Sequence, residues 1–261
     1  MIVTVTAYKR PELLERCLES LTNADLRLVT GVLVSLDHHS EQMTEDMKEA
    51  FWTYEHKLPK GTTLLHQVER LGVANHPRAV FNMLQEKAEN TVGVDYLQAT
   101  REPICAIEED TIVSPDCFVF VDWALRQKGY QFVNLADHLK TGTDVSAIHE
   151  DWILSSPYGW AFTPAFWRQL EPRWNGKIRL PVGWDWQVTH LCYREGWKSL
   201  TPEVARVYNT GRGGGTYDTP DNWDRTQKDV VLCSTIPNKY VIVKHERPST
   251  PPDWVIEEMR L

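Results

Sequence analysis

Three adjacent acidic residues are the strongest chemical signal in the chain. Glu108, Glu109 and Asp110 follow directly on the apolar segment 103–107. Neighbouring carboxylates repel one another unless a cation neutralises them. Their oxygens suit a hard divalent ion, Mg²⁺ or Mn²⁺, that takes its remaining ligands from water and a substrate phosphate. A solvated strand end would explain the charges equally well, but the apolar segment before them favours a site.

Polar residues also follow two earlier apolar segments. Asp37 comes after residues 32–36, where its carboxylate could accept a hydrogen bond from a base N–H or a ribose hydroxyl. An ordinary turn or helix-capping aspartate is the alternative. Lys9 and Arg10 follow the first apolar segment and could approach a diphosphate, although surface charge accounts for either one alone.

A further carboxylate stands between two indole rings. Asp185 lies between Trp184 and Trp186, after Gly183, at the expected start of a helix. Partial desolvation there would make it a competent base. The alternative is an acidic residue of the first helical turn, stabilised by the helix dipole.

Two other features carry weaker signals. No second histidine has metal-ligand spacing to His76, which favours a structural role for it. The glycine-rich segment 211–215 lacks the Gly-Lys-Ser/Thr of a nucleotide-binding loop. It could be a mobile lid in which Arg212 reaches a phosphate, or a plain surface loop.

Strand and helix patterns alternate along the first half of the chain. Buried strands are expected at 2–7, 32–36, 63–68, 103–107 and 130–135, and helices at 11–21, 41–55, 73–88 and 115–128. The second half is less regular, with a short strand at 159–163 and helices at 164–171 and 184–195. This order predicts a Rossmann-like α/β fold with a mostly parallel sheet between helices. Asp37 and the acidic run would then share the carboxyl edge, where such sheets bind ligands.

Composition bounds the class of protein. The 261 residues include 36 acidic and 28 basic side chains, a formal charge of −8, and 42% are apolar. These values exclude a largely disordered chain, and no apolar run is long enough to span a bilayer. The net acidity disfavours general binding to phosphate polymers. The five cysteines form no C-x-x-C pair, and no signal peptide is evident, so we expect a reducing, cytoplasmic location.

Eight ordered segments together resemble the N-acetylglucosaminyltransferase I family, which includes the protein O-mannose β-1,2-N-acetylglucosaminyltransferases. They are TAYKRPELLERCL (6–18), VSLD (34–37), LGVANHPRAVF (71–81), IEED with SPDCF (107–118), GWAF to EPRW (159–174), WDW (184–186), PEVAR (202–206) and GRGG (211–214). The resemblance implies a GT-A glycosyltransferase fold over residues 1–247, with a nucleotide-sugar half at about 1–137 and an acceptor half at about 138–247. Residues 248–261 would be an irregular tail.

The resemblance also implies a donor site. Asp110 would coordinate Mn²⁺ that bridges the diphosphate of a UDP-sugar. Glu108 would lie near the ribose or the donor sugar, Glu109 would line the same pocket, and Asp37 would face the uracil. The segment that contains His76 and Arg78 would lie beside the donor.

The remaining roles concern the transfer itself. Asp185 would be the catalytic base, and Arg212 would belong to a loop that orders over the nucleotide. An inverting transfer needs one base for the acceptor hydroxyl and a neutralised leaving diphosphate, and this set of residues supplies both. The family members carry an N-terminal membrane anchor and a stem; because the first strand is expected to begin at residue 2, we expect neither here. The Glu at 109 stands where Asp is commoner. A different acceptor is therefore expected.

Two acceptor classes remain open from the sequence. One is a glycan, and the other is a 5-hydroxymethylpyrimidine in DNA. Residues 160–198 hold six of the 11 tryptophans among arginines and lysines, and such interleaving suits a flipped base or a sugar platform. A non-catalytic module that binds a nucleotide sugar or a glycan is the alternative from another class.

Overall fold

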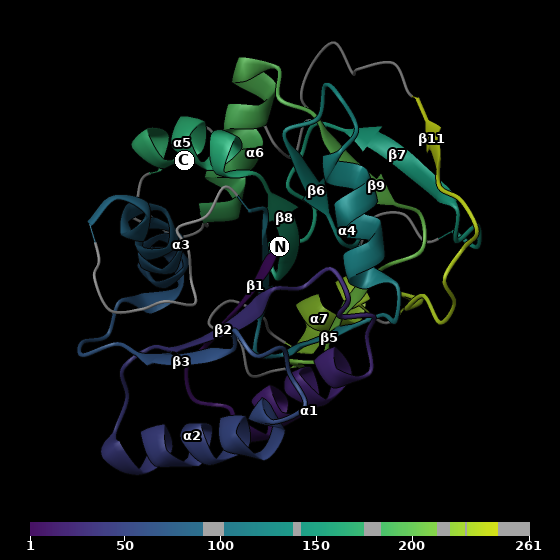
Figure 1. The fold of residues 1–261 in the computed structure, drawn as a ribbon. Coiled ribbons are helices and arrows are strands. Elements are labelled where there is room, and N and C mark those ends of the chain that lie inside the picture. Colours follow the sequence, from purple (N-terminus) through teal and green to yellow (C-terminus); the bar gives the residue numbers. More distant parts are fainter. Residues whose placement is uncertain (91–101, 138–141, 175–183, 213–219, 228, 245–261) are drawn as a thin grey trace.

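One nine-stranded sheet organises the molecule. The structure is a computed structural model that describes residues 1–90, 102–137, 142–174, 184–212, 220–227 and 229–244. The strand order is β11-β7-β9-β6-β8-β4-β1-β2-β3, and β5 and β10 form a separate two-stranded ribbon. The predicted tail 248–261 lies outside the described residues. Figure 1 shows the sheet running through the centre of the molecule, with helices on both sides.

The N-terminal part is a parallel α/β unit. Its elements are β1 (Ile2–Ala7), α1 (Pro11–Thr22), β2 (Gly31–Leu36), α2 (Glu41–Glu55), β3 (Thr63–His66), α3 (Gly72–Asn90) and β4 (Ile104–Glu108). β1 lies between β2 and β4 and is parallel to both. Pro11 begins α1 at a position where its missing N–H costs nothing, and the Ser40 hydroxyl caps α2.

The rest of the chain extends the sheet and adds the ribbon. It consists of β5 (Thr111–Val113), α4 (Cys117–Leu125), β6 (Phe132–Asn134), β7 (Ala147–Asp151), β8 (Gly159–Phe162), α5 (Pro164–Leu170), the 3₁₀ turn η1 (Glu171–Arg173), α6 (Trp184–Glu195), β9 (Ser199–Pro202), β10 (Val207–Asn209), α7 (Pro220–Gln227) and β11 (Val241–Val243). β8 is antiparallel to both β4 and β6. The expected strand at 2–7 and the expected helices at 41–55 and 184–195 are confirmed at both ends, and the other expected elements differ by one to a few residues at their ends.

Two hydrophobic cores lie on opposite faces of the sheet. Alternate strand residues divide between them: Val3 and Val5 of β1 belong to one core, whereas Ile2 belongs to the other. The first core packs the sheet against α1, α2 and α4. The second packs it against α3, α5 and α6. This period of two follows from the strand geometry, so each strand is apolar along both faces.

The tryptophans of residues 160–198 fill the second core. Trp160, Trp167, Trp174, Trp184 and Trp197 are all buried, and they pack on one another and on Phe81, Phe162 and Phe166. These five rings are shared between the sheet, α5 and α6 as core residues, and of the five Trp160 and Trp184 also line a pocket. Within the described parts of the chain, no helix combines the length and apolar character that a membrane crossing requires.

Candidate active site

The carboxyl ends of β1, β2 and β4 bring the predicted polar residues to one edge. In the parallel register Thr6 is paired with Glu108, and Ala7 with Leu36. The residues that follow these strands therefore start from the same level of the sheet. This register brings Arg10, Asp37 and the acidic run to the same edge of the sheet, although up to 100 positions separate them in the sequence.

Arg10 lies between two carboxylates of the acidic run. Its Nε donates a hydrogen bond to Glu109 Oε1 at 2.8 Å, and Nη2 lies 2.8 Å from the same oxygen. Nη1 lies 2.8 Å from Asp110 Oδ2, but without the alignment of a hydrogen bond. The side chains of Glu109 and Asp110 are only 7% and 5% exposed. Arg10 is thus the counter-ion that allows two neighbouring carboxylates to be buried.

The segment after β10 closes the site from the other side. The backbone N–H and the hydroxyl of Thr210 both donate to the Asp110 carbonyl oxygen, at 2.6 and 2.9 Å. A Cβ on Gly211 would overlap Asp110 Oδ2 and crowd Arg10 Nη1, so glycine is required for this close approach. Oδ1 of Asp110 is buried without a hydrogen-bond partner. One strong acceptor of the site is left for a ligand to satisfy.

The acidic run is electrostatically unbalanced. Burial, together with the charges of Asp110 and Glu109, raises the pKa of Glu108 to about 8. Burial also raises the pKa of Glu109 and of Asp110, although the Arg10 guanidinium opposes both shifts. One positive charge therefore faces three acidic groups, and an added cation would lower all three pKa values.

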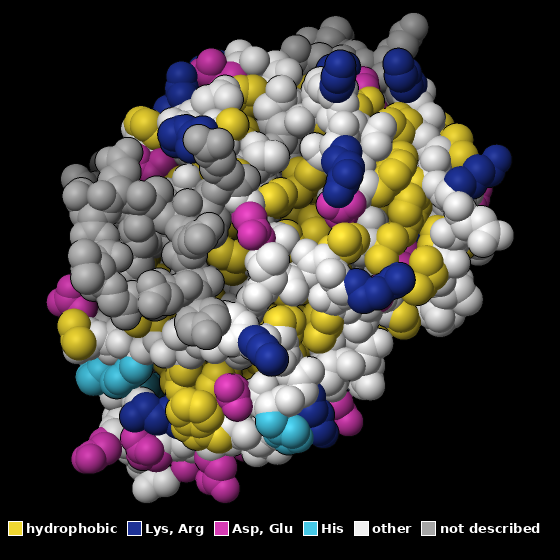
Figure 2. Space-filling view, viewed as in Figure 1, with side chains coloured by type: hydrophobic (Ala, Val, Ile, Leu, Met, Phe, Trp, Pro, Cys, Tyr) yellow, Lys and Arg dark blue, Asp and Glu magenta, His cyan; other side chains and the backbone are white. Residues whose placement is uncertain are grey.

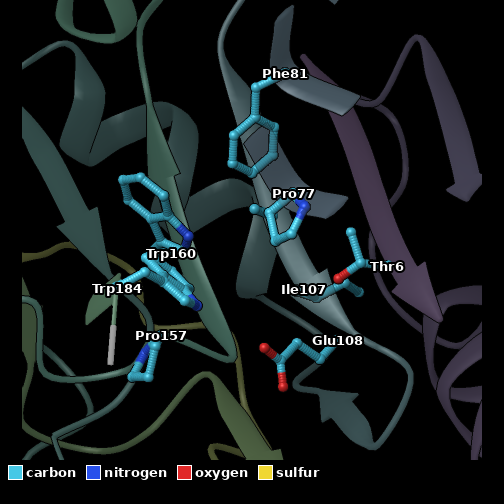
Figure 3. A pocket seen from close by; sticks show the side chains of 9 residues that line it. Thr6, Pro77, Phe81, Ile107, Glu108, Pro157, Trp160 and Trp184 are labelled. Atoms are coloured by element: carbon cyan, nitrogen blue, oxygen red, sulfur yellow. The ribbon is translucent and has the colours of Figure 1, made fainter. Parts of the chain in front are cut away.

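Glu108 also lines a pocket between the sheet and α6. Thr6, Ile107 and Glu108 form one wall, and Pro157, Trp160 and Trp184 form the facing one. Pro77 and Phe81 of α3 close the pocket, which holds about 220 Å³ of open space. In Figure 3 the Glu108 carboxylate is turned towards the gap between its own strand and the Pro157 wall.

Asp185 is the next residue after the pocket-lining Trp184, in the first turn of α6. Its side chain is partly exposed, and its negative charge contributes to the raised pKa of Glu108. The structure thus brings Asp185 and the acidic run to the same place. Asp185 and Asp110 are 75 positions apart in the sequence.

Asp37 and His76 have partners that the sequence did not reveal. The Asp37 carboxylate accepts hydrogen bonds from the backbone N–H groups of Leu71 and Gly72, at 2.7 and 2.8 Å, where α3 begins. His76 Nε2 lies 2.8 Å from the Ser35 hydroxyl. Burial lowers the His76 pKa to about 4 against the opposing charge of Asp37. Both residues therefore hold α3, and with it Pro77 and Phe81, at the pocket.

Three predicted donor residues make contacts elsewhere. Lys9 is exposed, with its ammonium 5.6 Å from the Tyr8 ring centroid. Arg78 forms an ion pair with Glu171 of η1 at 2.6 Å. Arg212 is exposed and forms a bidentate pair with Asp224 of α7, at 2.7 and 2.8 Å. None of these contacts is with the acidic run.

Basic residues of the 160–198 stretch form no continuous surface where the structure describes them. Arg194 pairs with Glu195 at 2.8 Å, and Lys198 pairs with Glu150 at 2.9 Å. On the face in Figure 2, the described lysines and arginines lie singly, separated by neutral and acidic side chains. Lys177 and Arg179 lie outside the described residues. The basic and aromatic features that suggested a DNA acceptor therefore gain no support from the fold.

The acidic run fits a divalent cation held by a single protein residue. Among the residues that the structure describes, no group of three or more His, Cys, Asp or Glu is placed to surround an ion. The unpartnered Oδ1 of Asp110 is instead one hard oxygen ligand. A cation with few protein ligands, which takes the rest from water and phosphate, suits such a site.

Several site residues were not predicted from the sequence. Thr6, Pro77 and Phe81 of the pocket and Ser35 behind His76 carried no chemical signal, because apolar and hydroxyl residues are common in any core. Gly211 did have a signal, as the first residue of the glycine-rich segment. Its contact with Asp110 depends on the pairing of β10 with β5.

Comparisons with known proteins identify the fold. No family model and no curated sequence matches this chain. Among solved structures it is similar to the mannosyltransferase PcManGT from Pyrobaculum calidifontis, in complex with GDP-Man and Mn²⁺, with 16% identity and a TM-score of 0.57. It is also similar to residues 1–349 of S. aureus TarS, with 13% identity and a TM-score of 0.53. The chain has the fold of a glycosyltransferase.

These similarities extend over most of this chain but only part of the neighbours. They cover 82% and 80% of the residues here, against 58% and 60% of the two neighbouring chains. The expected α/β fold, with a large, mostly parallel sheet flanked by helices, is confirmed. Sequence identities this low show a shared fold and no more, so the resemblance to the N-acetylglucosaminyltransferase I family remains a prediction.

Proposed function

We propose that this protein is a metal-dependent, inverting glycosyltransferase that moves a hexose, best matched by N-acetylglucosamine, from a UDP-sugar to an acceptor hydroxyl. The observation that carries the proposal is the buried acidic run at the carboxyl edge of the sheet. It has one unsatisfied carboxylate oxygen and lies beside a pocket lined by Trp184, the residue before Asp185. The Mn²⁺ and nucleotide-sugar complex of the similar mannosyltransferase supports the choice of cofactor and donor class.

The donor half of the mechanism rests on Asp110. Its free Oδ1 would hold Mn²⁺ or Mg²⁺, which would neutralise the charge that develops on the leaving diphosphate. Arg10 and Lys9 follow β1 at the same edge, where cationic side chains can attract the diphosphate. Glu108 faces the pocket, where its carboxyl group could form a hydrogen bond with a hydroxyl of the donor sugar.

The other predicted donor residues would act in three ways: through a free acceptor position, through the wall that they position, or after a change of ion-pair partner. Asp37 accepts the N–H groups of His38, Leu71 and Gly72, and a carboxylate has about four acceptor positions, so one stays open to the uracil N–H. His76 and Arg78 belong to the wall formed by α3 and would act on the donor by positioning that wall. Arg212 would have to exchange Asp224 for a phosphate oxygen.

Asp185 is proposed as the base. Inversion requires a group on the acceptor side that removes the hydroxyl proton as the oxygen attacks the anomeric carbon. Asp185 begins α6 beside the pocket, across from the β4 end that carries Asp110, and its partly exposed side chain can reach an acceptor. Glu108 is less suited to this task, because it ends β4 on the donor side, two residues before the proposed metal ligand Asp110.

The decisive experiment is a nucleotide-release screen with Mn²⁺. It would combine UDP-GlcNAc, other UDP-hexoses and GDP-mannose with glycan acceptors and with DNA that contains 5-hydroxymethylcytosine or 5-hydroxymethyluracil. The proposal expects acceptor-dependent release of UDP that is lost in Asp110→Asn and in Asp185→Asn. Asp122→Asn, which changes a half-buried carboxylate on α4 paired with Arg126, is the matched control and should be fully active.

Each alternative has its own outcome in this screen. Turnover only with modified DNA would identify the second acceptor class. Release of GDP alone would correct the donor. Tight nucleotide-sugar binding that Asp185→Asn leaves intact, with no turnover on any acceptor, would indicate a non-catalytic binding module and overturn the proposal.

A further inference from the structure

Arg10 occupies the place from which a cation would act on Asp110. Its guanidinium lies between Glu109 and Asp110 and is the one cationic group that the described contacts place against the acidic run. A divalent ion on Asp110 would therefore enter a site that already holds a positive charge. Like charges a few ångströms apart in a buried site repel strongly.

The two contacts of Arg10 differ in kind. With Glu109 it makes an aligned hydrogen bond from Nε and a second close contact from Nη2, both at 2.8 Å. With Asp110 it makes a single contact, from Nη1 to Oδ2 at 2.8 Å. Glu109 thus holds the guanidinium through two of its nitrogens, and Asp110 holds it through one.

Asp110 keeps one coordinating oxygen free while Arg10 is in place. Oδ2 faces Arg10, whereas Oδ1 is buried without a partner in a residue that is 4% exposed. Gly211 closes directly over Oδ2 and Nη1, so the pair has little room to separate sideways. Metal and arginine would therefore act on the same carboxylate through different oxygens.

We propose that Arg10 is a resident counter-ion that keeps the acidic run folded without metal and, by its charge, weakens the binding of divalent cations to Asp110. The inference rests on the proposed function, since it takes Asp110 as the metal ligand. It assigns Arg10 a positioning and affinity-setting role that is separate from any contact with the donor. Removing the charge should therefore tighten metal binding, even though it removes a native contact.

The test is a direct Mn²⁺ titration of the full chain without nucleotide, followed by electron paramagnetic resonance of free Mn²⁺. Arg10→Gln should bind Mn²⁺ about ten- to a hundredfold more tightly than the wild type, because a neighbouring unit charge is gone. Arg10→Lys keeps the charge and should stay close to the wild type. Arg27→Gln, which changes an exposed arginine that pairs with Asp25, should not change the affinity.

Thermal melting gives a second readout. Without metal, Arg10→Gln should melt below the wild type, and saturating Mn²⁺ should raise its Tm by more than it raises that of the wild type. Unchanged or weaker Mn²⁺ binding by a folded Arg10→Gln would overturn the inference and leave the proposed function standing. No Mn²⁺ binding by the wild type, or equal binding by Asp110→Asn, would overturn both.

Discussion

Two arginines of this protein each meet a buried carboxylate, in very different surroundings. Arg206 and Asp116 have fully buried side chains, joined from Nε to Oδ2 at 2.9 Å. Asp116 also accepts hydrogen bonds from the hydroxyls of Ser114 and Tyr240, at 2.8 and 3.1 Å. The guanidinium donates to two backbone carbonyl oxygens as well. This cluster has one charge of each sign, and neither residue leaves a buried polar atom unsatisfied.

The Arg10 cluster lacks that balance. One guanidinium faces Glu109 and Asp110, with Glu108 next to them, and an oxygen of Asp110 has no partner. The Arg206 cluster is closed, because no buried polar atom of Arg206 or Asp116 is left unpaired, so it stabilises the fold and offers a ligand no free donor or acceptor. An open, over-acidic cluster costs stability in the absence of a ligand, which is the usual condition of a functional site. The contrast separates a structural from a functional use of the same residue types.

Breaking the closed cluster should have the largest effect on stability. Arg206→Met leaves Asp116 buried and uncompensated, so the free energy of unfolding should fall by about 3–5 kcal/mol. Denaturant unfolding measures it. Arg126→Met, which removes an exposed pair with Asp122 on α4, is the control and should cost less than about 1 kcal/mol. A loss of under about 1 kcal/mol in Arg206→Met would show that the cluster does not stabilise the fold.

Removing a charge from the Arg10 cluster should have the opposite effect on the stability of the metal-free protein. Asp110→Asn removes one excess negative charge, so the metal-free protein should be as stable as the wild type or more so. Its rate of sugar transfer should fall by about 10³-fold, because the leaving group loses its neutralising ion. Unfolding and initial-rate measurements on one preparation test both parts. A strongly destabilised Asp110→Asn would place Asp110 with Asp116 as a structural carboxylate.

A substitution at Gly211 tests the geometry of the Arg10 cluster without altering its charge. Gly211→Ala places a methyl group against Asp110 Oδ2 and Arg10 Nη1, so the carboxylate must move. Overpacking of this kind costs about 1–3 kcal/mol, and Mn²⁺ affinity should fall with it. Calorimetric titration and thermal melting would detect the two effects. Full retention of affinity would mean that the acidic run does not depend on the closing segment 209–211.

A pH series should show the smallest effect. The folded-state pKa of His76, about 4, lies below its ordinary value of 6.5 because of burial. The unfolded chain therefore takes up a proton before the folded one as pH falls, and stability present above pH 6.5 is lost towards pH 4. His76→Gln keeps a partner for Ser35 and should remove most of that loss. Parallel wild-type and His76→Gln curves between pH 6.5 and 4 would contradict this.

Sequence reasoning predicted the layers well and the contacts poorly. The alternation of apolar strands with amphipathic helices predicted α1, α2 and α6, because the spacing of core-facing residues is a local property of the sequence. It also placed Asp37 and the acidic run at one sheet edge, since both follow buried parallel strands. The aromatic stretch misled, because a buried tryptophan and a ligand-stacking tryptophan have the same sequence pattern.

Long polar side chains were the hardest to place. Arg78 and Arg212 carried the same donor-site prediction as Arg10, yet only Arg10 contacts the acidic run in the structure. A long, flexible side chain can pair with any acid within its reach. Which acid that is depends on neighbours from α7 or η1 that sequence spacing does not reveal.

The amino-acid sequence by itself determined the α/β class, the strand ends that carry acidic residues, and a set of motifs that resembles one glycosyltransferase family. These are local properties, set by hydrophobic period and by the position of charge after an apolar strand. Only the tertiary structure decided that Arg10 neutralises Glu109 and Asp110, that Gly211 closes over Asp110, and that the Asp185 end of α6 lies at the Glu108 pocket. These residues are 77 to 101 positions apart in the sequence, and strand register and core packing bring them together.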